Sequence, residues 1–200
     1  MNLINKIHTD YIHSRRVEKL SQHLSELIPL KSRVLDVGCG DGLLAQLIAQ
    51  KRPDIEIRGV DVLLRANGRF PIAEFDGENL PFADKSFEVV LFVDVLHHTE
   101  NPLILLKEAK RVAKECILLK DHTRKGFLAG SILRLMDYVG NAKHGVSLPY
   151  NYWTEQQWTE AVKELDLTVE DWKPKLELYN KVADRFFGGN LHFVAKLRIN

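Results

Sequence analysis

The stretch VLDVGCGDG, residues 34–42, decides how the rest of the chain folds. It begins inside a short apolar run, residues 33–37, which ends in a cluster of glycines, and this pattern is typical of a buried strand followed by a tight turn. After the glycines, apolar residues recur at helical spacing over residues 43–48. The stretch therefore predicts a strand, a glycine-rich turn and a helix.

The same alternation continues along the chain. Apolar runs typical of strands occur at IEIRGVD (55–61), more weakly at FPIAEFD (70–76), and again at FEVVLFVD (87–94) and ECILLKD (115–121). A helical pattern with Pro102 near its start separates the last two. Parallel sheets with helices on both faces have this pattern, so we predict an α/β fold with a doubly wound sheet.

The flanking segments extend this plan. Apolar residues from Val17 to Ile28 predict an amphipathic helix before the first strand, and residues 132–139 predict another helix. Thr154 and Gln157 form a capping box before a further helix. Strands are predicted from residue 167 to 172, extending towards Tyr179, and from 191 to 199. No helix-length crossover precedes the last strand, so these two strands should pair antiparallel.

Composition excludes several classes of protein. The 200 residues carry 28 Lys and Arg against 27 Asp and Glu, so the net charge of +1 gives no general attraction to nucleic acid or to an anionic bilayer. Apolar runs are too short for a membrane span. No secretion signal is found at the start, and two cysteines, Cys39 and Cys116, form no disulfide framework. We therefore expect a cytoplasmic protein.

Acidic residues follow three of the predicted strands. Asp36, Asp61 and Asp76 lie at the carboxyl ends, where open parallel sheets bind ligands. The glycines of the first turn let the backbone approach a ligand and place a helix amino-terminus beside it. Carboxylates and backbone amides together suit a ligand that has hydroxyl groups, an amine and both signs of charge.

Two kinds of nucleotide cofactor compete at this turn. A nicotinamide dinucleotide site requires Gly-x-Gly-x-x-Gly, and its third glycine would stand where the chain has Leu43. The third glycine is instead Gly42, and no Gly-Lys-Ser/Thr of a P-loop follows. The dinucleotide interpretation, and with it an NAD(P)-dependent oxidoreductase, therefore takes second place.

Four motifs in order, VLDVGCGDG (34–42), GVD (59–61), FDGENLPF (75–82) and FEVVLFVDVLHHTENP (87–102), make the chain resemble class I S-adenosylmethionine-dependent methyltransferases, especially the ubiquinone/menaquinone-pathway group. The resemblance covers roughly residues 34–120. It implies a three-layer, Rossmann-like sheet of seven strands, mostly parallel with the last strand antiparallel. It further implies S-adenosylmethionine as cofactor, with S-adenosylhomocysteine as product, lying across the carboxyl ends of the first strands.

The resemblance also implies roles for single residues. Asp36, Gly38 and Gly40 would border the methionine part of the cofactor, and Cys39 would be a small residue beside it. Asp61 would accept the ribose hydroxyls. Val62, Asp76 and Gly77 would lie around the adenine. Asp94 would lie near the methionine amino group and the sulfonium.

Histidines follow the fourth and fifth strands, where a methyl acceptor would lie. His97, His98 and His122 are candidates for a general base or for holding an acceptor oxygen, although capping a loop and bonding to backbone carbonyls is the more common role for any single histidine. Their spacing matches no dedicated metal-ligand motif, so we expect no metal. The residues proposed to contact substrate are Tyr11, Asp121, Asn141, Tyr150 and Tyr152. Basic residues Arg15, Arg16 and Lys19 are expected to form a solvated face.

Together these observations predict one methyltransferase domain acting on a small molecule at an oxygen, carbon or nitrogen atom. Its parts would be an amino-terminal helical segment (1–30), a cofactor-binding core (31–121), a substrate cover (122–153) and a final helix with two antiparallel strands (154–200). We expect no nucleic-acid partner, because no basic stripe is found. A methyltransferase-like protein that only binds a partner is the non-catalytic alternative.

Overall fold

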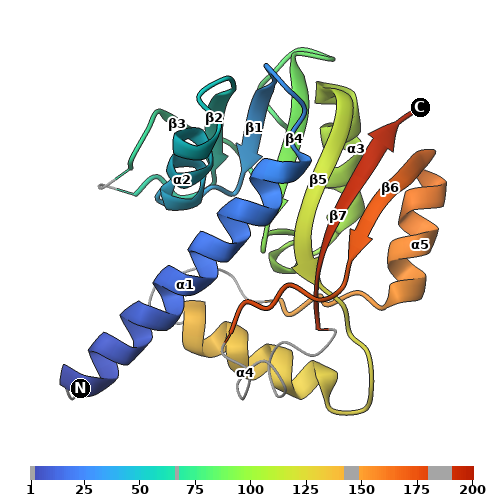
Figure 1. The fold of residues 1–200 in the computed structure, drawn as a ribbon. Helices are drawn as coiled ribbons and strands as arrows, with labels where there is room; N and C mark the ends of the chain where they lie inside the picture. Colours follow the sequence, from blue (N-terminus) through green and yellow to red (C-terminus); the bar gives the residue numbers. More distant parts are fainter. Residues whose placement is uncertain (1–2, 66–67, 142–148, 180–190) are drawn as a thin grey trace.

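The computed structural model describes the backbone of residues 3–65, 68–141, 149–179 and 191–200, and the side chains of these ranges except 3–14 and 139–141. The chain alternates strands and helices around one sheet (Figure 1). In chain order the elements are α1 (Leu3–Leu27), β1 (Arg33–Val37), α2 (Leu43–Lys51), β2 (Glu56–Asp61), β3 (Ile72–Glu74), β4 (Phe87–Val93), the 3₁₀ turn η1 (Leu96–His98), α3 (Pro102–Val112), β5 (Ala113–His122), α4 (Ala129–Asn141), α5 (Glu155–Glu164), β6 (Leu167–Lys173) and β7 (His192–Ile199).

The sheet has seven strands in the order β3-β2-β1-β4-β5-β7-β6. Strands β1 to β5 pair in parallel, whereas β7 lies antiparallel between β5 and β6. The predicted fold class, with the last strand antiparallel, is therefore confirmed. Strand order reverses between β1 and β4, and ligands bind at this point in open α/β sheets.

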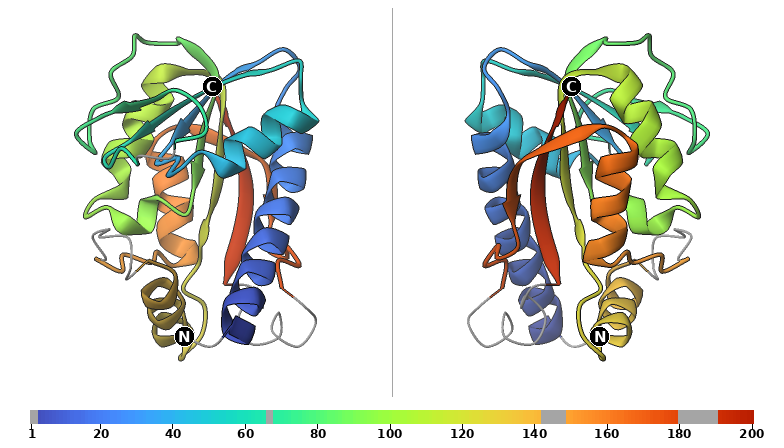
Figure 2. Two further views of the ribbon diagram at one scale, coloured as in Figure 1. Left: turned by 90° about the vertical axis from the view of Figure 1, so that its left-hand side faces the viewer. Right: turned by 90° about the vertical axis from the view of Figure 1, so that its right-hand side faces the viewer.

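Two apolar layers cover the two faces of the sheet (Figure 2). On one face, Leu20 and Leu24 of α1 and Ile48 of α2 pack over alternate residues of the central strands. On the other face, α3 and α5 contribute Leu106 and Trp158 to the larger cluster. Side chains of a strand point to opposite faces in turn, so consecutive residues at the end of β5 reach different layers.

Short-range signals fix several helix starts. The capping box predicted at Thr154 is present: Thr154 Oγ1 accepts a hydrogen bond from Gln157 N–H, and Gln157 Oε1 accepts one from Thr154 N–H. Asn101 caps α3, whose first residue is Pro102. The weak strand candidate at 70–76 shrinks to three residues, and the first helix begins earlier than its apolar pattern indicated.

Helix α4 lies below the carboxyl edge of the sheet, next to the amino-terminal part of α1 in Figure 1. It packs through Ala129 and Leu133 against Tyr152 and Leu191 in a small separate cluster. Among the helices of the described ranges, none has both the length and the apolar character that crossing a membrane requires.

Candidate active site

The glycine turn after β1 is tied to the end of β2. Gly38 N–H and Cys39 N–H both donate to the carbonyl oxygen of Val60, at 2.8 and 3.2 Å. Gly38 has a φ of +71°, and a Cβ placed on it would lie 2.5 Å from Val95 Cγ2. The turn therefore requires glycine both for its backbone conformation and for the close approach of the chain that follows β4.

Two of the predicted carboxylates are held at the ends of β1 and β2. Asp61 accepts hydrogen bonds from Gly40 N–H at 2.8 Å and from Leu63 N–H at 2.9 Å. Asp36 is only 2% exposed. Burial and the charge of Asp61 together raise the pKa of Asp36 to about 8. Burial likewise raises the pKa of the Cys39 thiol, which does not favour a nucleophilic role.

A third carboxylate, Asp76, is exposed in the loop after β3. It accepts hydrogen bonds from Glu78 N–H, Asn79 N–H and Asn79 Nδ2, and these bonds lower its pKa. A carboxylate has about four acceptor positions, so one position of Asp76 stays available to a ligand donor.

These residues surround one groove along the carboxyl edge of the sheet. A central cavity of about 400 Å³ adjoins a cavity of about 370 Å³ beside β3 and one of about 170 Å³ beside α2, and Gly38 lines all three. We call their union the groove. All nine residues that the resemblance implied for the cofactor line it: Asp36, Gly38, Cys39, Gly40, Asp61, Val62, Asp76, Gly77 and Asp94.

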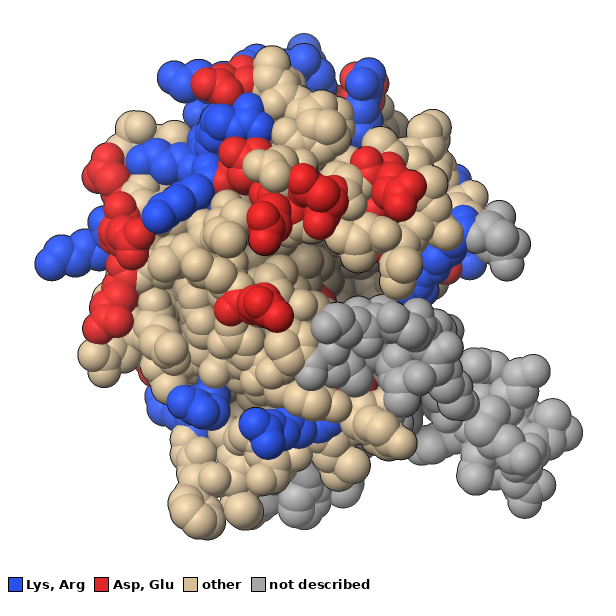
Figure 3. Space-filling model, turned by 180° about the vertical axis from the view of Figure 1, so that it is seen from behind, with Lys and Arg blue, Asp and Glu red and all other residues tan. Residues whose placement is uncertain are grey.

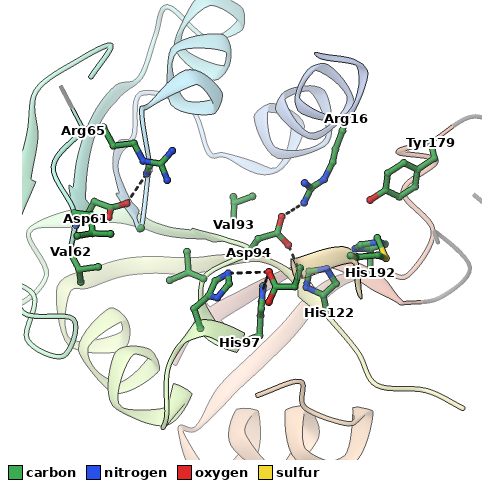
Figure 4. A pocket seen from close by; sticks show the side chains of 17 residues that line it. Arg16, Asp61, Val62, Arg65, Val93, Asp94, His97, His122, Tyr179 and His192 are labelled. Atoms are coloured by element: carbon green, nitrogen blue, oxygen red, sulfur yellow. Dashed lines mark hydrogen bonds and ion pairs between the residues drawn. The ribbon is translucent and has the colours of Figure 1, made fainter. Parts of the chain in front are cut away.

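Asp94, directly after β4, is the centre of an ionic cluster (Figure 4). Its carboxylate forms ion pairs with Arg16 of α1 and with Lys120 of β5, whose side chain is 0% exposed. Burial alone would raise the pKa of Asp94, but the charges of Lys120 and Arg16 outweigh it and hold the pKa well below its usual range. Asp94 also has a φ of +57°, an uncommon conformation for a non-glycine residue.

The cluster corrects one expectation. Arg16 was expected on a solvated face with Arg15, but it lines the central cavity and only 29% of its side chain is exposed. The sequence pattern could not show this, because the partner of Arg16 lies on another element. Arg15, in contrast, is exposed as expected.

The histidines form two groups according to the elements that carry them, and the two groups are in contact, because the ring centroids of His97 and His122 lie 4.7 Å apart. His122 and Lys120 point towards the α1 face, where His192 of β7 lies opposite His122 in register and Lys120 Nζ contacts His192 Nδ1 at 3.2 Å. Burial and the charge of Lys120 lower the pKa of His122 to about 4, so its imidazole is neutral at pH 7. His122 Nδ1 lies 3.5 Å from Asp94 Oδ1.

His97 and His98 form the second group. His97 Nδ1 lies 2.7 Å from Asp121 Oδ1. Burial opposes the charged form of His97, but Asp121 outweighs burial and raises the pKa of His97 to about 9. For His98, burial and the neighbouring charge of His97 lower the pKa. His97 is therefore a cation at pH 7 and a hydrogen-bond donor, whereas His98 and His122 are neutral and able to accept a proton.

The residues proposed to contact substrate divide among several places. Asp121 is 1% exposed beneath His97 and does not line the central cavity. Tyr152 is buried, and its hydroxyl donates to Asp137 Oδ2 at 2.9 Å. Tyr150 lines a different cavity, of about 380 Å³, together with Arg134. The side chains of Tyr11 and Asn141 lie outside the described residues.

Several residues of the cavity wall and of the ionic cluster around Asp94 were not singled out from the sequence. They are Arg65, Lys120, Asp137, Tyr179 and His192, of which all but Lys120 line the central cavity. A signal existed for two of them, since Lys120 and His192 stand in or beside apolar strand runs, and a charged residue in a buried strand must find a partner. Asp137 had no such signal.

On the face shown in Figure 3, acidic side chains gather beside a hollow, and basic side chains lie mainly towards the periphery.

Known proteins share both the sequence pattern and the fold. A family described as "Methyltransferase domain" matches residues 9–171. A ubiquinone biosynthesis O-methyltransferase of Dinoroseobacter shibae is 30% identical over 129 residues, covering 57% of this chain and 50% of that protein. A demethylmenaquinone methyltransferase of Thermotoga maritima is 31% identical over 120 residues, covering 56% and 52%. The chain thus spans about half the length of these curated relatives.

A chain from the complex of the Haloferax volcanii Trm112 methyltransferase activator with a methyltransferase superposes with a TM-score of 0.73, at 14% identity, covering 95% of this chain and 92% of that one. This likeness concerns the fold alone. The family match, by contrast, covers most of the present sequence, including the glycine turn, β4 and the histidines that follow it. The chain belongs to the methyltransferase-domain family, and its resemblance to the class I S-adenosylmethionine-dependent methyltransferases is confirmed.

Proposed function

We propose that the protein transfers a methyl group from S-adenosylmethionine to a hydroxyl group of a small molecule. The observation that carries this proposal is the groove, because residues from four separate motifs border it without a break. Its central cavity, about 400 Å³, is of the size that small-molecule sites have.

The chemistry of the groove fits the cofactor. S-adenosylmethionine, when bound, supplies a methyl group activated by a sulfonium. Asp61 is held by two backbone amides, so its outer lone pairs face the place of the ribose hydroxyls. Val62 and Gly77 border the cavity beside β3, where a flat base would lie. The wall there combines apolar surface with one free acceptor position on Asp76.

The opposite end of the groove suits an amino acid group. Arg16 offers a guanidinium to a carboxylate, and Asp94 beside it offers a carboxylate to an ammonium group. Asp36 lies at the floor of the cavity beside α2. A cation bound nearby would favour the ionised form of Asp36, which burial opposes in its absence.

An acceptor hydroxyl must lose its proton during transfer, and the central cavity has neutral imidazoles to receive it. His98 and His122 both line this cavity. One of these two imidazoles would act as the general base. The remaining contribution of the protein is alignment of the two reactants and exclusion of water. The name of the Dinoroseobacter shibae relative, an O-methyltransferase, supports an oxygen acceptor.

Calorimetric titration with S-adenosylhomocysteine tests the cofactor part. We expect one binding site per chain and at least about tenfold weaker binding for Asp61→Ala, since a lost charged hydrogen-bond pair is worth about 1.5–3 kcal/mol. Asp84→Ala is the matched control, because Asp84 pairs with Arg111 on an exposed turn. No binding by the wild type would overturn the proposal, and binding of NADH in its place would restore the dinucleotide alternative.

Formation of S-adenosylhomocysteine tests the acceptor part. The protein is incubated with S-adenosylmethionine and with hydroxylated aromatic compounds, each paired with its analogue in which the hydroxyl is already methylated. Turnover confined to the free hydroxyl supports the proposal. Turnover with both members of a pair would place the transferred methyl group on another atom.

A further inference from the structure

Three side chains that could bind a metal converge on the wall of the central cavity. His97 and His98 come from η1, and Asp137 comes from α4. His98 Nε2 lies 3.6 Å and His97 Nε2 lies 3.8 Å from the same oxygen, Asp137 Oδ1. One ligating atom of each residue lies within 4.8 Å of the other two.

These separations are close to those of a coordination sphere. Zinc binds histidine nitrogen and carboxylate oxygen at about 2.0–2.2 Å, so two ligands of a tetrahedral site stand about 3.3–3.5 Å apart. The two distances to Asp137 exceed this by a few tenths of an ångström. The histidine nitrogens lie within 4.8 Å of each other, so rotation of the side chains would bring all three ligand atoms to one ion.

Further hydrogen bonds hold these ligands in orientation. Asp121 Oδ1 pairs with Nδ1 of His97, which turns Nε2 of that ring towards Asp137. The Tyr152 hydroxyl donates to Asp137 Oδ2, which leaves Oδ1 towards the histidines. Metal-bound histidines and carboxylates are usually supported by such partners. The side chains of His97 and Asp137 are 3% and 5% exposed, so the arrangement is built into the structure.

We propose that His97, His98 and Asp137 bind one divalent transition-metal ion, with open coordination positions towards the central cavity. Two imidazoles and one carboxylate suit Zn²⁺ or Fe²⁺ better than Mg²⁺ or Ca²⁺. A second group, which includes Asp94 and His122, suits a metal less, because Asp94 already pairs with Arg16 and Lys120.

Residue spacing along the chain did not indicate this site, and no metal was expected. Two ligands are adjacent in the chain, and the third comes from a helix that follows the next strand, so no ligand motif exists. Within the proposed methyl transfer, and resting on it, the open positions would bind and orient the acceptor oxygen. With the ion bound, His98 would serve as a ligand, so the acceptor's proton would pass to His122. Metal binding itself does not depend on that role.

Titration of the chelator-treated wild type with Zn²⁺, followed by calorimetry, is the first test. We expect one ion per chain, and Co²⁺ in its place should give visible absorption bands that Zn²⁺ abolishes. Weak binding of several ions, or no Co²⁺ bands, would overturn the inference. Neither result needs a variant, so a folding defect cannot hide the outcome.

Variants then locate the ion. His98→Gln and Asp137→Asn should each weaken Zn²⁺ binding at least tenfold, whereas His23→Gln, on α1 and bonded to the carbonyl oxygen of Leu176, should not change it. Unchanged binding in both cluster variants would overturn the assignment. S-adenosylhomocysteine is titrated into the same preparations. Cofactor binding without metal binding refutes this inference alone, and the reverse refutes the proposed function alone.

Discussion

The two ends of the groove are built in different ways. At the ends of β1 and β2, the backbone dominates: glycines shape the turn, and peptide amides hold Asp61. At the ends of β4 and β5, side chains from α1, η1 and α4 meet one another as ion pairs. A backbone-built site is encoded in a few consecutive residues, whereas a side-chain-built site depends on the whole fold. Four substitutions test this difference.

Asp36→Asn is expected to have the largest effect, in the backbone-built region. The pKa of this carboxyl rises from 3.8 to about 8 on folding, so the folded protein binds a proton that the unfolded chain has released. The free energy of unfolding is therefore highest below pH 3.8 and falls by roughly 6 kcal/mol as the pH rises to about 8. Urea unfolding across this range should show a steeper decline for the wild type than for the variant. Parallel profiles would contradict the prediction.

Asp94→Ala should destabilise the side-chain-built region by about 3–5 kcal/mol, because it leaves the buried ammonium of Lys120 without its carboxylate. The control is the double variant Asp94→Ala, Lys120→Met, which removes both charges and should recover much of the loss. Urea unfolding of all three proteins measures the effect. A double variant as unstable as the single one would show that the pair is not the cause.

Gly38→Ala should lower the free energy of unfolding by about 2 kcal/mol. The φ of +71° at this position disfavours any side chain, and Val95 occupies the space that the added Cβ would need. S-adenosylhomocysteine binding should fall with it, because the turn borders the groove. Gly126→Ala is the matched control: its φ is +92°, but nothing lies within 4 Å of the added carbon. Gly126→Ala should lower the stability measured by thermal unfolding less than Gly38→Ala does. It should leave cofactor binding unchanged. Equal losses of stability in the two variants would show that the contact with Val95 is not the cause.

Tyr152→Phe should have the smallest effect, about 1 kcal/mol, through the lost hydrogen bond to Asp137. Cofactor affinity should stay the same, which would separate the two regions functionally. Tyr138→Phe, on a side chain that is 61% exposed, serves as the control for urea unfolding. A clear change in S-adenosylhomocysteine binding by Tyr152→Phe would mean that the regions are coupled.

The same difference explains what could be predicted from the sequence. Strand and helix periodicity, the glycine turn and the capping box at Thr154 act over a few residues, and the structure agrees with them. The nine residues of the cofactor end were named because the resemblance of four local motifs implied them, and all nine line the groove. Arg16 and Asp137 were not, because their partners lie on other elements and only packing brings them together.

The position of β7 has a consequence for the order of folding. Residues 192–199 insert between β5 and β6, so β6 lies at the edge of the sheet and is joined to it through β7. During synthesis, β6 leaves the ribosome with no strand to pair with until β7 arrives. The pairing of His122 with His192 waits for the same event. Since such long-range pairing is slow, the cavity would be completed late, and a nascent chain would bind ligands only after its sheet had closed.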